Sequence, residues 1–142
     1  MVYTDLTKKA LKLSFETHKD QVDKTGMPYI FHPFHLAEQM DDEISTVCAL
    51  LHDVVEDSQI TFENLLQMGF PHEVIEVLKL LTHEKSVPYM QYVEKIATNP
   101  IAKKVKIADL RHNSDLTRLN VVDETALNRA NKYKRALDIL LK

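Results

Sequence analysis

The sequence predicts an all-α protein, a single helical bundle of about seven to eight helices that occupies residues 1–142. Apolar residues recur at three- and four-residue spacings through most of the chain, which is the period of a helix with one buried face. No segment shows the alternation with a period of two that indicates a half-buried strand. No internal repeat, low-complexity run or linker divides the chain, and its length suits one domain with one core.

The first half of the chain is expected to form helices over residues 4–18, 33–40, 43–57 and 61–69. Thr4, Thr61 and either Asp41 or Asp42 are the expected N-cap residues, because short polar side chains accept hydrogen bonds from free N–H groups at a helix start. A polar loop that contains Gly26 and ends at a proline separates the first two helices. The first helix is expected to bury Leu6, Ala10, Leu13 and Phe15.

The second half is expected to form helices over residues 71–81, 88–98, 101–113 and 123–141. Pro71 and Pro88 suit the first turns of two of these helices. Asp123 is the expected N-cap of the last helix. That helix is expected to bury Ala126, Leu127, Ala130, Leu137 and Leu140.

Composition excludes several classes of site. The two glycines, Gly26 and Gly69, leave no glycine-rich loop of the P-loop or dinucleotide-binding type. A net charge of −3 disfavours nonspecific nucleic-acid binding. The single Cys48 forms no disulfide within the chain, and neither a signal peptide nor an apolar stretch of about 20 residues is found. We therefore expect a soluble cytoplasmic protein with no nucleic-acid or membrane partner, whose oligomeric state is not defined by the sequence.

The stretch from Ala49 to Asp57 carries a His52-Asp53 pair and a Glu56-Asp57 pair one helical turn apart. At about 100° per residue, positions four apart lie about 40° from each other, so the four polar groups share one face of the expected helix. The opposite face is apolar and would be buried. The ordinary interpretation is an amphipathic helix with an acidic, solvated face. The alternative is a site in which imidazole and carboxylate groups act together.

Two residues elsewhere carry groups that a packed helical core does not need. His32 precedes a proline at a helix entrance, and Asp109 falls on the apolar face of its helix. A buried carboxylate is costly unless it is paired, hydrogen-bonded or bound to a cation. The candidate ligands of a divalent metal are therefore His32, His52, Asp53 and Asp109. Imidazole and carboxylate groups without thiolate favour Mn²⁺, Fe²⁺ or Mg²⁺ over a closed zinc site. The ordinary alternatives are a helix-entry histidine and an ion pair between Asp109 and a nearby lysine or arginine.

Three segments resemble a known family. The two histidines and two aspartates match the H…HD…D signature of the HD-domain metal-dependent phosphohydrolases. The Tyr-Ile-x-His-Pro and His-Asp-x-x-Glu-Asp elements are similar to those of the hydrolase half of RelA/SpoT proteins and of stand-alone small alarmone hydrolases. The segments that carry this resemblance are Gly26–Pro33, Leu50–Asp57 and Val105–Leu110, and the similarity extends from Leu6 to about Leu140.

The resemblance implies an all-helical HD domain that binds one Mn²⁺ and removes the 3′-pyrophosphate from guanosine tetra- or pentaphosphate. It makes the four candidate ligands the metal-binding set, and Glu56 and Asp57 the catalytic acidic pair. The length leaves no room for a synthetase domain, so any activity of this type would be hydrolytic only. The residues that it places around the nucleotide are Lys24, Tyr29, Lys85, Asn113 and Tyr133.

One departure from the family concerns the base. The family usually has an Arg-Lys pair before Gly-x-Pro-Tyr, with the arginine stacked on guanine, whereas this chain has Asp23-Lys24. An aspartate makes no such stacking contact and repels phosphate. An HD-type nucleotidase or phosphatase that acts on another nucleotide is therefore an alternative.

Two further alternatives stay open. A two-metal phosphodiesterase would need additional histidines, for which His35 and His112 are the nearest candidates, although each is more often a surface residue or a residue that supports a ligand. A noncatalytic nucleotide-binding module is the other, and the presence of both Glu56 and Asp57 argues against it.

Overall fold

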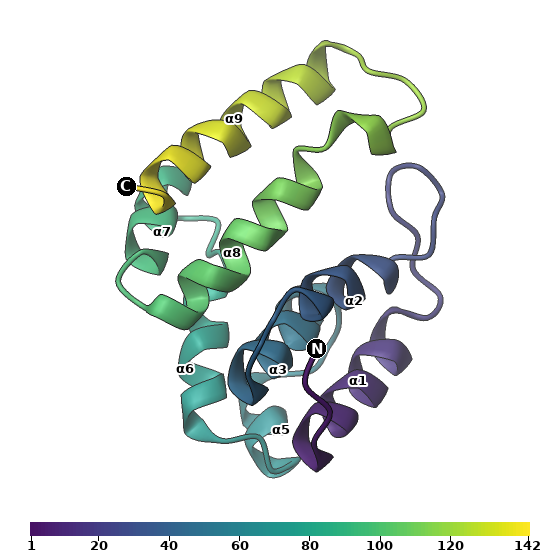
Figure 1. Ribbon diagram of the computed structural model, residues 1–142, viewed down its shortest axis with the longest axis vertical. Coiled ribbons are helices and arrows are strands. Elements are labelled where there is room, and N and C mark those ends of the chain that lie inside the picture. The colour runs from purple at the N-terminus through teal and green to yellow at the C-terminus, as the bar shows by residue number, and fades with distance from the viewer.

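The computed structural model describes residues 1–142 and contains nine α-helices, one 3₁₀ helix and no β-strand (Figure 1). This confirms the all-α fold class. The α-helices are α1 (Asp5–His18), α2 (Phe31–Glu38), α3 (Glu43–Leu51), α4 (Val54–Asp57), α5 (Phe62–Gln67), α6 (His72–Leu81), α7 (Tyr89–Ile96), α8 (Pro100–Asn113) and α9 (Glu124–Leu140), and the 3₁₀ helix η1 spans Leu116–Arg118. None of the helices is both long and apolar enough to cross a membrane.

The expected cap residues define several helix starts. In each case a side-chain oxygen accepts a hydrogen bond from the backbone N–H three residues further on, and Asp42 rather than Asp41 fills this role at α3. Such a cap contributes about 1 kcal/mol, because it satisfies an N–H group that has no partner within the helix. The four confirmed caps are Thr4, Asp42, Thr61 and Asp123.

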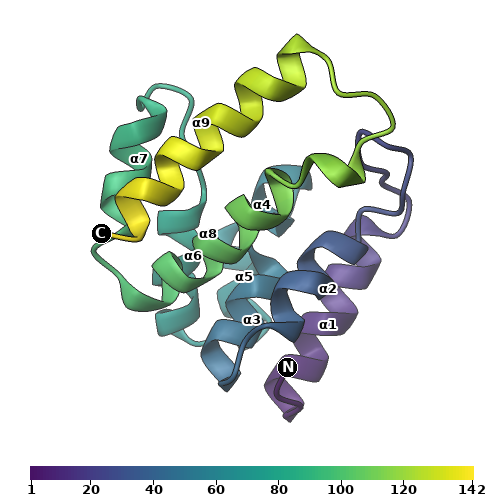
Figure 2. The same cartoon turned by 45° about the horizontal axis from the view of Figure 1, so that its top comes forward.

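Helix α3 lies at the centre of the fold and contacts α1, α2, α6 and α8 (Figures 1 and 2). Its residues from Ser45 to Leu51 are all buried, and they belong to or adjoin a continuous cluster of 26 buried hydrophobic residues. Helix α8 crosses beside α3, and α9 packs on α8 and α7. A residue at the end of α3 is therefore held against side chains of α2 and α8.

The prediction of one continuous helix over residues 43–57 is wrong, because α3 ends at Leu51 and the single turn α4 begins at Val54. Asp53, between them, has φ −108° and ψ 0°, which lies in the sparsely populated bridge region where active-site residues often sit. Nδ1 of His52 lies 2.7 Å from the carbonyl oxygen of Ala49. The break therefore coincides with the His-Asp pair and gives these two side chains directions that a regular helix does not.

Two predicted core residues are exposed. Phe15 in α1 and Leu127 in α9 have exposed fractions of 50% and 46%. Helical periodicity leaves a choice between neighbouring stripes, and the packing partners decide which stripe is buried. The buried stripe of α1 is the polar and small set Thr7, Ala10, Ser14 and His18, and that of α9 is Ala126, Ala130, Ala136 and Leu140.

Candidate active site

The four candidate metal ligands come together from three separate parts of the fold. His32 lies in α2, His52 and Asp53 lie between α3 and α4, and Asp109 lies in α8. Ligand atoms of His32, His52 and Asp109 all lie within 4.8 Å of one another. Asp53 Oδ2 is 2.9 Å from His52 Nε2 and 4.0 Å from His32 Nε2. Two imidazole nitrogens and two carboxylate oxygens therefore face one small volume.

The tautomer of His52 supports a cation in this volume. Its Nδ1 lies 2.7 Å from the carbonyl oxygen of Ala49, which can only accept, so Nδ1 carries the proton and Nε2 presents a lone pair. That Nε2 is buried, has no hydrogen-bond partner, and faces carboxylate oxygens of Asp53 and Asp109 at 2.9 and 3.6 Å. Acceptors facing acceptors repel unless a positive charge lies between them, so the residues present fit a divalent metal.

The charge balance of His52 leads to the same conclusion. Burial opposes a charge on this ring, but the carboxylates of Asp53 and Asp109 outweigh it and raise the pKa of His52 well above its ordinary value. A site with this balance takes up a proton or a metal ion, because either supplies the missing positive charge.

Asp109 is fully enclosed by partners. Its Oδ1 lies 2.8 Å from His32 Nε2 and accepts a hydrogen bond of 2.9 Å from the side-chain amide of Asn113, while Lys106 Nζ lies 2.9 Å from Oδ2. Burial alone would raise the pKa of Asp109, but Lys106 and the two histidines hold it well below its ordinary value. The predicted burial of this carboxylate and its pairing with a lysine are both found. The lysine binds one oxygen and leaves the other on the histidine side.

His112 supports His32 from the side away from the carboxylates. The Nδ1 atoms of the two rings are 2.7 Å apart and the rings are nearly parallel, with an interplanar angle of 6°. Burial, together with the positive charge of Arg118, lowers the pKa of His112 to about 4, so this ring is neutral near pH 7 and one of its nitrogens is an acceptor. In the tautomer in which His112 Nδ1 is that acceptor, His32 donates from Nδ1 and keeps Nε2 as a lone pair for the metal site.

Glu56 and Asp57 lie one turn beyond Asp53, on α4. Glu56 Oε1 accepts a hydrogen bond of 2.8 Å from the backbone N–H of His83, whereas the Asp57 carboxylate accepts none from the protein. Partial burial of the carboxyl group and the charges of Asp53 and Glu56 raise the pKa of Asp57 to about 6. Burial likewise raises the pKa of Glu56. Asp57 is thus an unpaired carboxyl group that titrates close to neutral pH.

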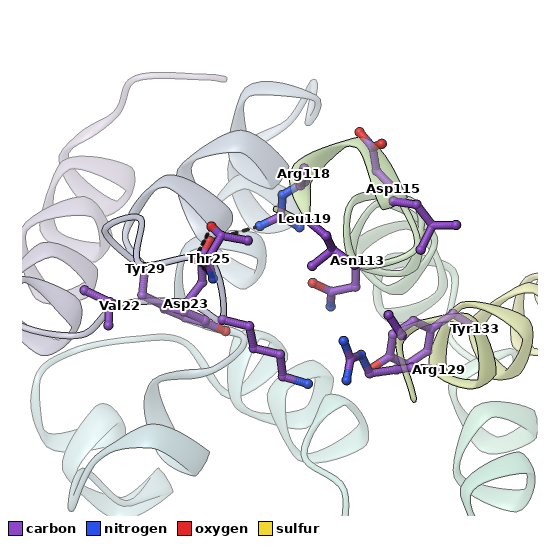
Figure 3. Close-up of a pocket in the computed structure, with 13 residues that line it drawn as sticks. Val22, Asp23, Thr25, Tyr29, Asn113, Asp115, Arg118, Leu119, Arg129 and Tyr133 are labelled. Atoms are coloured by element: carbon purple, nitrogen blue, oxygen red, sulfur yellow. Dashed lines mark hydrogen bonds and ion pairs between the residues drawn. The ribbon is translucent and has the colours of Figure 1, made fainter. Parts of the chain in front are cut away.

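A cavity of about 370 Å³ opens beside the ligand group, between the loop before α2 and the start of α9 (Figure 3). Tyr29 lies on the loop side, Tyr133 lies on α9, and Asn113 points between them. Lys24, from the same loop as Tyr29, also lines the cavity. Burial and the like charges of Arg129 and Lys132 lower the pKa of Lys24, so this region is positive. Four of the five residues expected around a nucleotide therefore line one cavity.

Lys85 is the exception. Its side chain is exposed in the loop between α6 and α7, and it lines neither this cavity nor the second one described next. The second cavity, of about 220 Å³, contains His52, Asp53 and Asp109 themselves, together with Glu56. Both cavities include Tyr133, which therefore lies where they meet.

Asp23, where the resemblance led us to expect arginine, organises the loop. Its Oδ1 accepts hydrogen bonds from the backbone N–H groups of Thr25 (2.8 Å) and Met27 (3.1 Å). Its Oδ2 pairs with the guanidinium of Arg118 at 3.4 Å (Figure 3). Gly26 has φ +83°, a conformation that favours glycine, and it closes the turn. The loop side of the larger cavity therefore carries a paired carboxylate and guanidinium.

No family model matches the chain. Individual relatives do. The GTP pyrophosphokinase of Myxococcus xanthus is 36% identical over a 127-residue alignment that covers 77% of this chain and 17% of that protein. The guanosine-3′,5′-bis(diphosphate) 3′-pyrophosphohydrolase MESH1 of Danio rerio is 36% identical over a 124-residue alignment that covers 78% of this chain and 68% of that protein.

The chain belongs to the guanosine-3′,5′-bis(diphosphate) 3′-pyrophosphohydrolase family. This confirms the resemblance to the RelA/SpoT hydrolases. The chain corresponds to about a sixth of the length of the Myxococcus protein and of the Aquifex aeolicus 3′-pyrophosphohydrolase, which is 30% identical over 117 residues. It corresponds to about two thirds of zebrafish MESH1.

A solved structure supports the fold of this family member. The chain superimposes with a TM-score of 0.81 and 24% identity on a protein described as a metazoan ortholog of SpoT that hydrolyses ppGpp, covering 99% of this chain and 88% of that one. At this identity the likeness establishes the all-α fold.

Sequence reasoning named His112 as a surface residue or a residue that supports a ligand without identifying His32 as its partner, and it missed the ion pair between Asp23 and Arg118. These pairs are separated by 80 and 95 residues, so no local pattern reveals them. The available signal was indirect: His112 directly precedes Asn113, within the segment that carries Asp109.

Proposed function

We propose that this chain is a metal-dependent phosphohydrolase that releases pyrophosphate from the 3′ position of guanosine tetra- or pentaphosphate. The observation that carries the proposal is the buried lone pair of His52 Nε2, which faces two carboxylates and lies in a cavity beside a larger, positive one. Family membership supports the choice of substrate.

The proposed metal ligands are His32, His52, Asp53 and Asp109, with Mn²⁺ as the metal and Fe²⁺ or Mg²⁺ as substitutes. A divalent ion held there would polarise a phosphoryl oxygen and lower the pKa of a bound water. The chain's own contribution is to keep the ligands fixed. Lys106 and Asn113 hold Asp109, His112 holds His32, and the Ala49 carbonyl holds His52.

Glu56 and Asp57 handle the proton. Because the pKa of Asp57 is about 6, its carboxylate is ionised at pH 7 and remains basic enough to accept a proton from the attacking water. Glu56, fixed by the backbone N–H of His83, orients that water. The water oxygen bonds to phosphorus, and the 3′ oxygen departs and takes up a proton to become a hydroxyl. Acid–base help of this kind accelerates a reaction by about 10²–10⁴-fold.

The two cavities divide the substrate between them. The smaller one is lined by three of the four proposed ligands and receives the reacting phosphates, while the larger one, with Tyr29, Asn113 and Tyr133, receives the nucleoside. Lys24 supplies a cation in the larger cavity. Tyr29 also donates a hydrogen bond from its hydroxyl to Asp53, so one side chain connects the nucleoside cavity to the ligand group.

Asp23 favours one alternative, a phosphohydrolase of the same chemistry that acts on a different nucleotide. With its Oδ1 occupied by the loop and its Oδ2 by Arg118, Asp23 does not stack on a base. Recognition of the base then depends on other groups at that end of the cavity, so guanine preference has to be measured.

A substrate panel with Mn²⁺ distinguishes the alternatives. Guanosine tetraphosphate, other 3′-phosphorylated nucleotides and nucleoside monophosphates are supplied in turn, and pyrophosphate and orthophosphate are quantified separately. Pyrophosphate from the guanosine compound supports the proposal, whereas orthophosphate from monophosphates supports the nucleotidase. Asp53→Ala should abolish turnover, and Asp20→Ala, which removes an exposed acid, should not. Full activity of metal-loaded Asp53→Ala would refute the ligand assignment.

A further inference from the structure

The smaller cavity extends beyond the ligand group to residues of α7 and α9, among them Lys132, to which the proposed mechanism assigns no role. There it is bounded by the tyrosines Tyr89, Tyr92 and Tyr133 and by two lysines, Lys106 and Lys132. Its volume is about 220 Å³. A single phosphoryl group at the ligands leaves part of this space to be filled.

The two lysines differ in what their charge does. Lys106 is buried, and its Nζ pairs with Asp109 Oδ2 at 2.9 Å, so the carboxylate neutralises its charge. Lys132 forms no ion pair and donates no hydrogen bond to the protein. Its Nζ lies 4.3 Å from the ring centre of Tyr89 and 5.6 Å from that of Tyr133.

The aromatic contacts hold Lys132 in place without neutralising it. A cation over an aromatic ring is attracted by the ring quadrupole, but its N–H groups remain free to donate to an anion. The ammonium group of Lys132, on α9, therefore lines the same cavity as His52, Asp53 and Asp109.

We infer that Lys132 binds the distal phosphoryl group of a diphosphate ester whose proximal phosphoryl group lies at the metal ligands. The inference rests on the proposed function for the location of the proximal group. The ligand class is a pyrophosphoryl compound, since a monophosphate at the ligands leaves Lys132 without a partner. Lys132 thus selects diphosphate over monophosphate. Lys24 and Lys85, the lysines that the resemblance placed around the nucleotide, lie outside this cavity.

Inorganic pyrophosphate and orthophosphate are the probes. Their affinities for the Mn²⁺-loaded protein are measured by calorimetry, and Mn²⁺ affinity is measured separately. Lys132→Met keeps the apolar stem and removes the charge, Lys132→Arg keeps a cation, and Lys134→Met removes an exposed charge from the same helix outside both cavities. Thermal unfolding verifies that each variant is folded.

Lys132→Met should weaken pyrophosphate binding about tenfold, the equivalent of a charge-assisted hydrogen bond. Orthophosphate and Mn²⁺ affinities should change by less than about twofold, and Lys132→Arg should retain most of the pyrophosphate affinity. Equal losses for both anions, no loss for pyrophosphate, the same loss in Lys134→Met, or no pyrophosphate binding by the unaltered protein would each overturn the inference.

The outcome is separable from that of the proposed function. A selective loss of pyrophosphate affinity in Lys132→Met, in a protein that fails to hydrolyse guanosine tetraphosphate, would leave the diphosphate site standing and refute the substrate. Hydrolysis of guanosine tetraphosphate by the unaltered protein, together with unchanged pyrophosphate affinity in Lys132→Met, would support the proposed function and refute the role of Lys132.

Discussion

Replacing Asp57 by asparagine should stabilise the metal-free protein near pH 7 while it impairs hydrolysis. The carboxylate accepts no hydrogen bond from the protein, so the amide loses no contact. Folding raises the pKa of this group from 3.8 to about 6 because burial, Asp53 and Glu56 disfavour its charge. The folded state therefore carries a charge that costs free energy, and the substitution removes it.

The magnitude and the pH window follow from the two pKa values. A difference of about two pKa units corresponds to about 3 kcal/mol at 1.36 kcal/mol per unit. Asp57 is exposed, so solvent screening reduces the expected gain to about 1 kcal/mol. Below about pH 4 the group is protonated in both states and the gain vanishes. Between pH 4 and 6 the unfolded state loses its proton first, so the stability of the unaltered protein falls as pH rises, and above pH 6 the full cost persists.

Thermal and urea unfolding of Asp57→Asn in chelator, at pH 3.5 and pH 7.5, tests this. For 142 residues a gain of 1 kcal/mol raises the melting temperature by about 3 °C. Asp138→Asn makes the same charge change at an exposed position of α9 and serves as the control. Turnover with Mn²⁺ should fall about 10²–10⁴-fold in Asp57→Asn. A destabilised variant at pH 7.5, or a gain that persists at pH 3.5, would refute the electrostatic reasoning.

Three other predictions concern the ligands and the loop. Mn²⁺ at 100 times its dissociation constant should stabilise the protein by about 2.7 kcal/mol, which raises the melting temperature by about 9 °C. His52→Ala should lose this rise, whereas the control His72→Ala, which removes an exposed histidine, should keep it. His112→Phe should weaken Mn²⁺ binding about tenfold, because it removes the acceptor for His32. His112→Asn retains an acceptor and should weaken binding less. Equal losses of Mn²⁺ affinity in the two variants, measured by calorimetry, would contradict the role of His112 in positioning His32. Asp23→Asn keeps the Oδ1 acceptor of the loop but removes a negative charge from the larger cavity, next to Lys24. The KM for guanosine tetraphosphate, a highly anionic substrate, should therefore fall about threefold; an unchanged or raised KM would show that the Asp23 charge does not act on the bound substrate.

The sequence identified the helices where local interactions define them. Caps such as Thr4 and Asp123 act within four residues, and the helical period of α6, with Val74, Ile75, Leu78 and Leu81 buried, is visible without any partner. It could not choose the buried stripe of α1 or α9, because that choice depends on the helix packed opposite. Nor did it show the break between α3 and α4, where His52 contacts the Ala49 carbonyl and Asp53 leaves the helical region.

The chemistry of the site divides in the same way. Residue types and their spacing made His32, His52, Asp53 and Asp109 the candidates, because Asp109 falls on the apolar face of its helix, where an unpaired carboxylate is costly, and the other three carry groups that helix packing does not need. Only the tertiary structure decided which side chains hold each of these four residues and where the lysine and arginine side chains lie. It paired His32 with His112, Asp109 with Lys106 and Asp23 with Arg118, and it placed Lys132 rather than Lys85 in the cavity with the ligands. Side chains up to 95 residues apart meet through the packing of α2, α8, α9 and the loops between them, and such contacts leave no periodic trace in the sequence.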